Sequence, residues 1–289
     1  SFNSEIGLPL TIIGCPNAWS DIFLWIKNIF IGLDVVLFNK HYPETLVLEV
    51  GADRPQDIEK VGKWLKTDVS VITTIGKTPV HVEYFDSPEA VRKEKGYLAK
   101  AVKKDGTLIL NADEEGDKNF FAELTQAKVL TFGFSNSADV RAGDYAILYN
   151  EHTNKPVGIS YQVKNNKKGS QNEQISQNSK IKIMGVVGRQ SVYSTLAAVA
   201  VGVSMNMSLE DISKALSSHE SPLGRMKILA GVNDSVIIDD TYNSSPVAAE
   251  EALSTLKEIK IENSGQENRV QENGVQINGG RKIAVLGDM

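Results

Sequence analysis

Short β-branched runs alternate with segments of helical spacing between residues 45 and 134. The runs that predict strands are Thr45–Val50, Val69–Ile75, Thr107–Leu110 and Lys128–Phe134. Helical spacing follows Pro55, and a second helix is predicted from the N-cap residue Ser87 through Val102. Such alternation is typical of βαβ units. The sequence therefore predicts an α/β fold with a mostly parallel sheet flanked by helices, and ligand sites at the carboxyl ends of its strands.

The rest of the chain predicts additions to this sheet and a second unit. Antiparallel strands are expected at Asp144–Tyr149, Pro156–Val163 and Ile181–Val187, and helices at Ser191–Val203 and Leu209–Ser217. A new βαβ unit is expected after Gly224, with strand Val236–Asp239, helix Val247–Ile259 and strand Lys282–Leu286. We therefore expect two domains, 1–224 and 225–289. The polar tracts 164–180 and 260–280 predict flexible insertions, because they can bury little apolar surface.

Charge and cysteine content limit the possible partners and the compartment. The 289 residues include 31 basic and 36 acidic side chains, and the net charge of −5 without a basic block gives no electrostatic reason to expect nucleic acid. The single cysteine, Cys15, excludes an internal disulfide framework and a multi-cysteine zinc site. We expect a cytoplasmic monomer. Because the chain begins without methionine and stops after an apolar run, we also expect a piece of a longer protein.

The most apolar stretch is Ile22–Phe38. Its 17 residues are at the short limit for a membrane span, and Lys27, Asn28 and Asp34 interrupt it. Apolar residues recur at helical spacing, so we expect a helix with a broad buried face. A helix lying on a membrane surface is the alternative, and membrane association is not excluded.

Three residues at strand–helix junctions suggest a site for a divalent metal and phosphate. Glu49 ends one predicted strand, and His81 follows the next. Lys95 interrupts the apolar stripe of a predicted helix, where burial of an unpaired ammonium group would lower its pKa and favour a paired, reactive or modified lysine. An acid, an imidazole and an unusual lysine at one edge of a sheet are consistent with metal and phosphate chemistry.

A second group of candidate residues lies around the expected domain boundary. Arg225 follows Gly224, and an arginine at such a junction is suited to contact phosphate or carboxylate across a cleft. The run 239–243 closes the next strand, where nucleotide groups bind in such folds. The segment 76–78 (GKT) is not a phosphate-binding loop, because Val71 stands where that motif requires its first glycine.

Ten short motifs in this order resemble the Mur ligases, and among them the MurF type. They are Asn3–Pro9, Leu48–Asp53, Pro79–Phe85, Glu94–Gly96, Asn111–Asp113, Ser137–Tyr145, Gly188–Ala198, Pro222–Met226, Asp239–Pro246 and Val285–Met289. The resemblance spans nearly the whole chain. It implies a central ATPase domain that is entered after its phosphate-binding loop, followed by the beginning of a Rossmann-like C-terminal domain.

The resemblance also implies roles for particular residues. Glu49 and His81 would be magnesium ligands, and Lys95 would be carbamylated and hold a second magnesium ion, with Lys95 and His81 as the catalytic residues. The implied nucleotide- and substrate-binding residues are Asn3, Ser194, Arg225, Asp240, Tyr242 and Asn243. The segment Gln190–Ser194 departs from the family pattern, as does Ser245.

The implied activity is ATP- and Mg²⁺-dependent amide formation in peptidoglycan precursor synthesis. The ligase would join D-Ala-D-Ala to a UDP-muramoyl-tripeptide through an acyl phosphate. Two alternatives remain open. One is a related Mur or folylpolyglutamate-type ligase with another amino-acid substrate, and the other is a non-catalytic nucleotide-binding homologue. The fragment alone is expected to be inactive.

Overall fold

A six-stranded mixed sheet forms the centre of the molecule. The structure is a computed structural model that describes residues 6–38, 42–76, 79, 82–166, 178–260, 271–272, 275–276 and 281–287. The strands follow chain order: β1 (Thr67–Ile72), β2 (Val102–Asn111), β3 (Lys128–Gly133), β4 (Val140–Tyr149), β5 (Pro156–Asn165) and β6 (Asn178–Met184). β1 to β4 are parallel neighbours, whereas β5 is antiparallel to β4 and to β6. The predicted α/β fold with antiparallel additions is confirmed.

Residues of β2 alternate between two apolar layers, so both faces of the parallel part are covered. Ile109 belongs to a core shared with β3 to β6 and with Val192 and Leu196 of helix α6 (Arg189–Ser204). Leu108 and Leu110 point to the other core, which contains Phe121. That core packs under α4 (Pro88–Ala101) and α5 (Glu115–Ala122). Because a strand reverses its side chains at every residue, this alternation places one helix layer on each face.

Several helices begin where their capping residues predict. The Ser87 side chain accepts a hydrogen bond from Ala90 N at the start of α4, and Ser208 does the same for Asp211 N at the start of α7 (Leu209–Ser217). Helix α3 (Asp57–Trp64) begins two residues after Pro55. Helix α5 was not expected from the sequence, although its residues Phe120 and Phe121 supply apolar contacts to the sheet.

The part after Gly224 forms a hairpin and a helix. Strand β7 (Lys227–Ala230) pairs antiparallel with β8 (Val236–Asp239), and α8 (Pro246–Glu258) follows with Ser245 as its N-cap. The strand expected at Val236–Asp239 and the helix expected at Val247–Ile259 are confirmed as β8 and α8, whereas β7 was not expected. The strand expected at Lys282–Leu286 is wrong, because the segment 281–287 has no strand assignment, so the described residues do not complete the expected βαβ unit. The boundary at Gly224 stays a prediction.

The strand expected at Thr45–Val50 is wrong as well. The segment has no strand assignment, and its side chains are largely exposed, with 91% exposure at Val47. A β-branched run becomes a strand only when a neighbour satisfies its backbone hydrogen bonds. Within the described part of the chain, no strand pairs with these residues, so Glu49 does not end a sheet strand.

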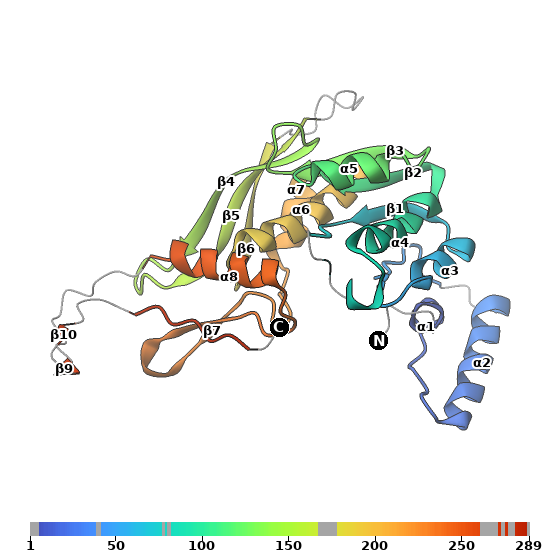
Figure 1. Cartoon of the computed structure of the whole chain (residues 1–289), viewed down its shortest axis with the longest axis horizontal. Helices are drawn as coiled ribbons and strands as arrows, with labels where there is room; N and C mark the ends of the chain where they lie inside the picture. The colour runs from blue at the N-terminus through green and yellow to red at the C-terminus, as the bar shows by residue number, and fades with distance from the viewer. Residues whose placement is uncertain are drawn as a thin grey trace.

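The apolar stretch near the N-terminus is a helix, but its broad face is exposed. Helix α1 (Gly7–Ile13) precedes α2 (Ile22–Leu37), and Figure 1 shows both at the edge of the molecule, away from the sheet. Asn28 is the buried residue of α2, whereas Phe23 is 81% exposed. The expectation of a buried apolar face is therefore wrong. Among the described residues, no helix is both long and apolar enough to cross a membrane.

The two polar tracts contain some ordered backbone. β5 extends to Asn165 and β6 begins at Asn178, so Lys164 pairs with Asn178 inside the first tract. Backbone pairing continues there because it does not require apolar side chains. In the second tract, β9 (Gln271–Glu272) and β10 (Val275–Gln276) pair antiparallel. The remaining expectation of flexibility falls on 167–177, 261–270, 273–274 and 277–280, which lie outside the described residues.

Candidate nucleotide and ligase site

The carboxyl ends of β1, β2 and β3 lie together, as a parallel sheet requires. Asn111 at the end of β2 donates a hydrogen bond from Nδ2 to Thr74 Oγ1, after β1, at 3.1 Å. Two residues later, the Asp113 carboxylate accepts hydrogen bonds from Phe134 N and Ser135 N, both at 2.7 Å. The side chains of Asn111 and Asp113 therefore connect the ends of β1, β2 and β3 through hydrogen bonds.

Helix α6 brings further groups to this edge. The Tyr193 hydroxyl donates a 2.8 Å hydrogen bond to Asp113 Oδ2. The Tyr193 ring meets the Phe134 ring edge to face, with centroids 5.3 Å apart. The Arg189 guanidinium lies 4.2 Å from the centre of the same Phe134 ring. The edge thus carries one exposed cation beside an aromatic pair, a combination that attracts anions and planar groups. Sequence reasoning did not assign Tyr193 or Arg189.

Lys95 is half-buried on α4, as its position on an apolar stripe predicts. Burial lowers the pKa of the Lys95 ammonium group, and the negative charge of Asp117 partly opposes this shift. Asp117, on α5, forms an ion pair of 2.6 Å with Arg92 Nε, one turn before Lys95. A lysine with a lowered pKa contains more of the neutral amine, which is the nucleophilic form. Helix α5, which the sequence did not predict, therefore supplies Asp117, the acid whose negative charge acts on the pKa of Lys95.

Glu94, the neighbour of Lys95, holds two helices together. Its side chain is buried, and Oε1 accepts hydrogen bonds from Ile58 N at 2.7 Å and from Glu59 N at 2.9 Å. These amides belong to the first turn of α3, which otherwise has no side-chain cap. A carboxylate at this end also matches the helix dipole. Glu94 thus fixes α3 against α4 next to Lys95.

The three residues expected to bind magnesium are not brought together by what the structure describes. Glu49 is exposed on a segment without strand pairing, and His81 lies outside the described residues, as does Asn3. Within the described ranges, no group of three acidic, histidine or cysteine side chains could hold a metal ion. The ligand set Glu49, His81 and Lys95 stays a prediction.

Residues around Gly224 do come together. Gly224 N donates to Asp239 Oδ2 at 2.9 Å, and Met226 N donates to Asp240 Oδ1 at 3.1 Å. The Arg225 guanidinium lies 4.1 Å from the centre of the Tyr242 ring. Burial raises the pKa of the Asp240 carboxyl, while the Met226 amide and Arg225 oppose this shift. Arg225 and Tyr242 are both exposed, so a cation and an aromatic face are presented side by side to solvent.

Two other predicted residues are not joined to this group by a described contact. Asn243 is exposed, one residue beyond Tyr242. Ser194 is exposed on α6, and its hydroxyl donates a hydrogen bond to Gln190 O within the same helix at 3.3 Å. Of the nucleotide-binding residues expected from the sequence, the structure therefore groups Arg225, Asp240 and Tyr242.

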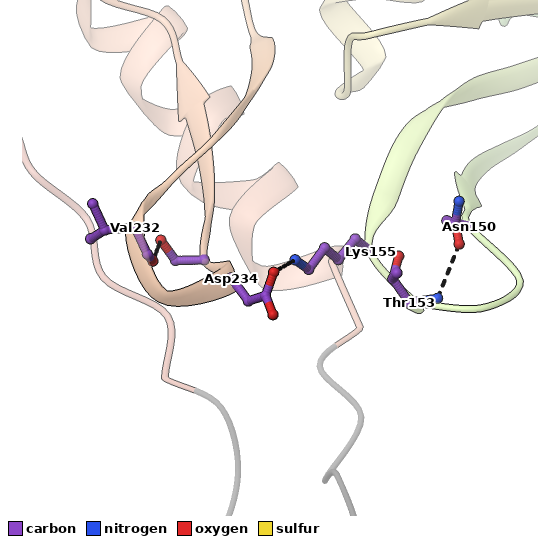
Figure 2. A network of polar contacts seen from close by, with 6 residues as sticks. Asn150, Thr153, Lys155, Val232 and Asp234 are labelled. Carbon is purple, nitrogen blue, oxygen red and sulfur yellow. Dashed lines mark hydrogen bonds and ion pairs between the residues drawn. The ribbon is translucent and has the colours of Figure 1, made fainter.

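Backbone hydrogen bonds connect this group to the sheet. Val187 N donates to Met226 O at 3.2 Å, and Ile228 N donates to Gly185 O at 2.8 Å, so the start of β7 lies antiparallel beside the segment that follows β6. At the far end of β7, Lys155 Nζ pairs with Asp234 Oδ1 at 2.9 Å (Figure 2). Residues of the β4–β5 hairpin and of the β7–β8 hairpin line a cleft of about 230 Å³ there. The cleft is remote from Asp240 along the hairpin and includes none of the predicted site residues.

Together, the fold and these groups define an α/β protein with its functional groups at strand ends and at the start of a following unit. The chain belongs to the Mur ligase family: residues 28–202 match the family model described as the Mur ligase middle domain. This match confirms the family resemblance and the fold class expected from the sequence.

Individual relatives extend the similarity beyond the middle domain. The chain is 25% identical to the UDP-N-acetylmuramoyl-tripeptide–D-alanyl-D-alanine ligase of Mycobacterium leprae and 24% identical to that of Bacillus subtilis, over 100% of this chain and 49% of each relative. It is 28% identical to a 2,6-diaminopimelate ligase of Bacillus velezensis over 66% of this chain and 36% of the relative. The chain spans about half the length of the D-Ala-D-Ala ligases that it matches.

Solved structures support the same fold. MurF from Acinetobacter baumannii superposes with a TM-score of 0.66 at 19% identity, covering 90% of this chain and 48% of that one. The MurF ligase from Thermotoga maritima in complex with ADP gives a TM-score of 0.62 at 22% identity, covering 78% and 48%.

Proposed function

We propose that this chain is part of an ATP-dependent ligase of peptidoglycan precursor synthesis that joins D-Ala-D-Ala to a UDP-muramoyl-tripeptide. The observation that carries the proposal is the similarity of the entire chain to two ligases named for this reaction. A relative solved with ADP is consistent with ATP as the energy source. A soluble, cytoplasmic setting would suit these substrates.

Within this proposal, the described residues divide into two groups. Arg225, Asp240 and Tyr242 would bind the nucleotide, with Arg225 neutralising phosphate charge and the Tyr242 ring offering a stacking surface. Asn3, Asn243 and Ser194 are further candidates for substrate and nucleotide contacts. Magnesium, if held by Glu49, His81 and a carbamylated Lys95, would neutralise the charge of the transferred phosphoryl group.

Lys95 is the residue on which the catalytic proposal is most readily tested. Its half-buried position and lowered pKa favour the neutral amine, which is the form that reacts with carbon dioxide to give a carbamate. The ammonium group first loses one proton to give the neutral amine, and the amine loses a second proton as its nitrogen bonds to the carbon of carbon dioxide, so that a cation becomes a carbamate anion. The carbamate form would reduce the cost of placing a charged group on an apolar stripe, because a bound cation could neutralise the carbamate anion.

The experiment is an amide-formation assay on the protein encoded by the complete reading frame. Lys95→Ala is expected to lower turnover at least about a hundredfold. Lys93→Ala, an exposed lysine of the same helix, is the matched control and should retain activity. Unchanged turnover in Lys95→Ala would refute the catalytic role of this lysine.

A second substrate class has its own support, because the diaminopimelate ligase shows the highest identity of the three relatives compared above. The same assay with D-Ala-D-Ala and with diaminopimelate as competing amines separates the two. Preference for D-Ala-D-Ala supports the first proposal, and preference for diaminopimelate replaces it. Amide formation with neither amine, accompanied by nucleotide binding, would point to a non-catalytic homologue.

A further inference from the structure

Helix α2 presents a continuous apolar face to solvent. Figure 1 shows the helix at the edge of the molecule, beside α1. Its exposed apolar side chains are Ile22, Phe23, Ile26, Ile29, Phe30, Leu33, Val36 and Leu37. At about 100° per residue they occupy one arc of roughly 140°. Their exposed fractions lie between 47% and 81%. Because these exposed side chains are also neighbours on one arc, they form a continuous apolar patch rather than isolated exposed residues.

The opposite side of α2 is attached to its own chain, which fixes the direction of the apolar arc. Asn28 is buried, and its Nδ2 donates a hydrogen bond to Pro16 O at 2.8 Å. Gly32 faces Ile13 of α1, because a Cβ built on Gly32 would lie 3.6 Å from Ile13 Cδ1. The helix therefore cannot bury its outer arc by rotating about its axis without losing these contacts.

The spacing along the arc is that of a helix-pairing seam. Ile22, Ile26, Ile29, Leu33 and Val36 follow one another at intervals of four, three, four and three residues, which is a heptad pattern. Phe23, Phe30 and Leu37 widen the seam along one side. Apolar residues in this pattern are covered by a second helix that runs along the first.

Two charged residues beside the apolar arc favour one orientation of a second helix. Lys27 and Asp34 lie seven residues apart on the same flank of α2, and both are exposed. In a two-fold antiparallel pair of identical helices, Lys27 of each copy lies opposite Asp34 of the other. The midpoint of that register falls between Phe30 and Ile31, close to the centre of the apolar arc. In a parallel pair, Lys27 would instead face Lys27, and Asp34 would face Asp34.

We propose that α2 is a self-association surface that pairs antiparallel with α2 of a second copy of this chain. A two-fold contact of this kind uses the same patch on both subunits. A lipid surface is the less suitable occupant, because surface-bound helices have a basic polar flank, whereas Lys27 and Asp34 cancel and the chain carries a net charge of −5. The proposal replaces the monomer expected from the sequence.

The first test is sedimentation equilibrium of the 289-residue chain, up to about 0.1 mM, where even weak dimers are populated. A reversible dimer is expected. Phe30→Ser combined with Leu33→Ser should weaken it at least about a hundredfold, because two buried seam residues per copy are lost. Val232→Ser removes an apolar side chain elsewhere that is even more exposed, at 82%, and should leave the dimer unchanged. Circular dichroism and the unfolding midpoint verify that each variant is folded.

Charge reversal tests the register. Lys27→Glu or Asp34→Lys alone places like charges opposite each other twice per dimer, and each should raise the dimer dissociation constant about tenfold. The double variant Lys27→Glu/Asp34→Lys restores both pairs and should regain most of the wild-type affinity. These positions are exposed, so the variants are expected to fold normally.

Several results would overturn the proposal. A chain that remains monomeric throughout the concentration range excludes self-association through α2. The antiparallel register is excluded if the single charge reversals leave the dimer dissociation constant unchanged. It is also excluded if the double variant does not regain the affinity that the single variants lose. Binding of the monomer to phosphatidylcholine vesicles, lost in Phe30→Ser/Leu33→Ser, would assign the face to a lipid surface instead. None of these results depends on ligase activity.

Discussion

The hydroxyl group of Tyr193 on α6 lies 2.8 Å from Asp113 Oδ2 at the end of β2. Eighty residues separate the two side chains in the sequence. The same carboxylate also accepts hydrogen bonds from Phe134 N and Ser135 N after β3. Asp113 thus ties the start of a helix on one face of the sheet to two neighbouring strand ends.

Tyr193→Phe is expected to lower the free energy of unfolding by about 1 kcal/mol at neutral pH, because it removes a hydrogen bond to a carboxylate that keeps its other partners. Burial and the bond to Asp113 raise the pKa of Tyr193 above its ordinary value. Its contribution is therefore complete below about pH 10 and falls as the pH rises further, since the unfolded state ionises first.

Urea unfolding of wild type and Tyr193→Phe at several pH values checks this prediction. The wild type should lose more stability than the variant above pH ~10. Tyr97→Phe on α4, whose ring lies over Lys100, is the control and should follow the wild type. Parallel pH profiles for wild type and Tyr193→Phe would contradict the assigned role.

Glu94→Ala is expected to cost about 1–3 kcal/mol of stability, because two backbone amides at the start of α3 lose their buried acceptor. Glu94→Gln keeps one acceptor oxygen and should cost less. Glu89→Ala, an exposed acid of the same helix, should change stability by less than ~0.5 kcal/mol. The measurement is the free energy of unfolding in urea, and equal effects of all three substitutions would count against the cap.

Gly224→Ala is expected to destabilise more than Gly185→Ala. Both glycines have positive φ, +74° and +79°, so both alanine variants incur about 1 kcal/mol of backbone strain. Only at Gly224 would the new Cβ lie 2.7 Å from a backbone atom, Tyr242 N, whereas at Gly185 it meets nothing within 4 Å. Comparison of the two unfolding midpoints isolates this clash, and similar midpoints would argue against the tight approach of Gly224 to Tyr242.

The Lys155–Asp234 pair is expected to contribute almost nothing to stability. The two charges lie 2.9 Å apart, but the Asp234 side chain is 97% exposed (Figure 2). Solvent and salt screen such pairs. Lys155→Met, Asp234→Asn and their combination form a double-mutant cycle, whose coupling should be indistinguishable from zero at physiological salt. A clear coupling would instead make this pair a real connection between the β4–β5 and β7–β8 hairpins.

Local patterns predicted much of the fold because their causes are local. Ser87 and Ser208 begin α4 and α7 as expected, since a cap needs only its own first turn. Alternating apolar runs predicted β1, β2 and β3, whose backbones find partners in one another. The run Thr45–Val50 is also rich in apolar and β-branched residues, but among the described residues it has no pairing partner and is not a strand. Pairing, which composition does not encode, decided between these outcomes.

For the site, the sequence by itself determined the family, the sheet edge at Asn111–Asp113 and the unusual lysine at position 95. Each depends on residue type and spacing. Only the tertiary structure placed Asp117 where its charge acts on Lys95, Tyr193 on Asp113, and Arg225 against Tyr242. It also turned the apolar face of α2 outward, because Asn28 and Gly32 occupy the side that packs on the chain. Periodicity shows that a helix has an apolar face, but contacts distant in sequence decide which way that face points.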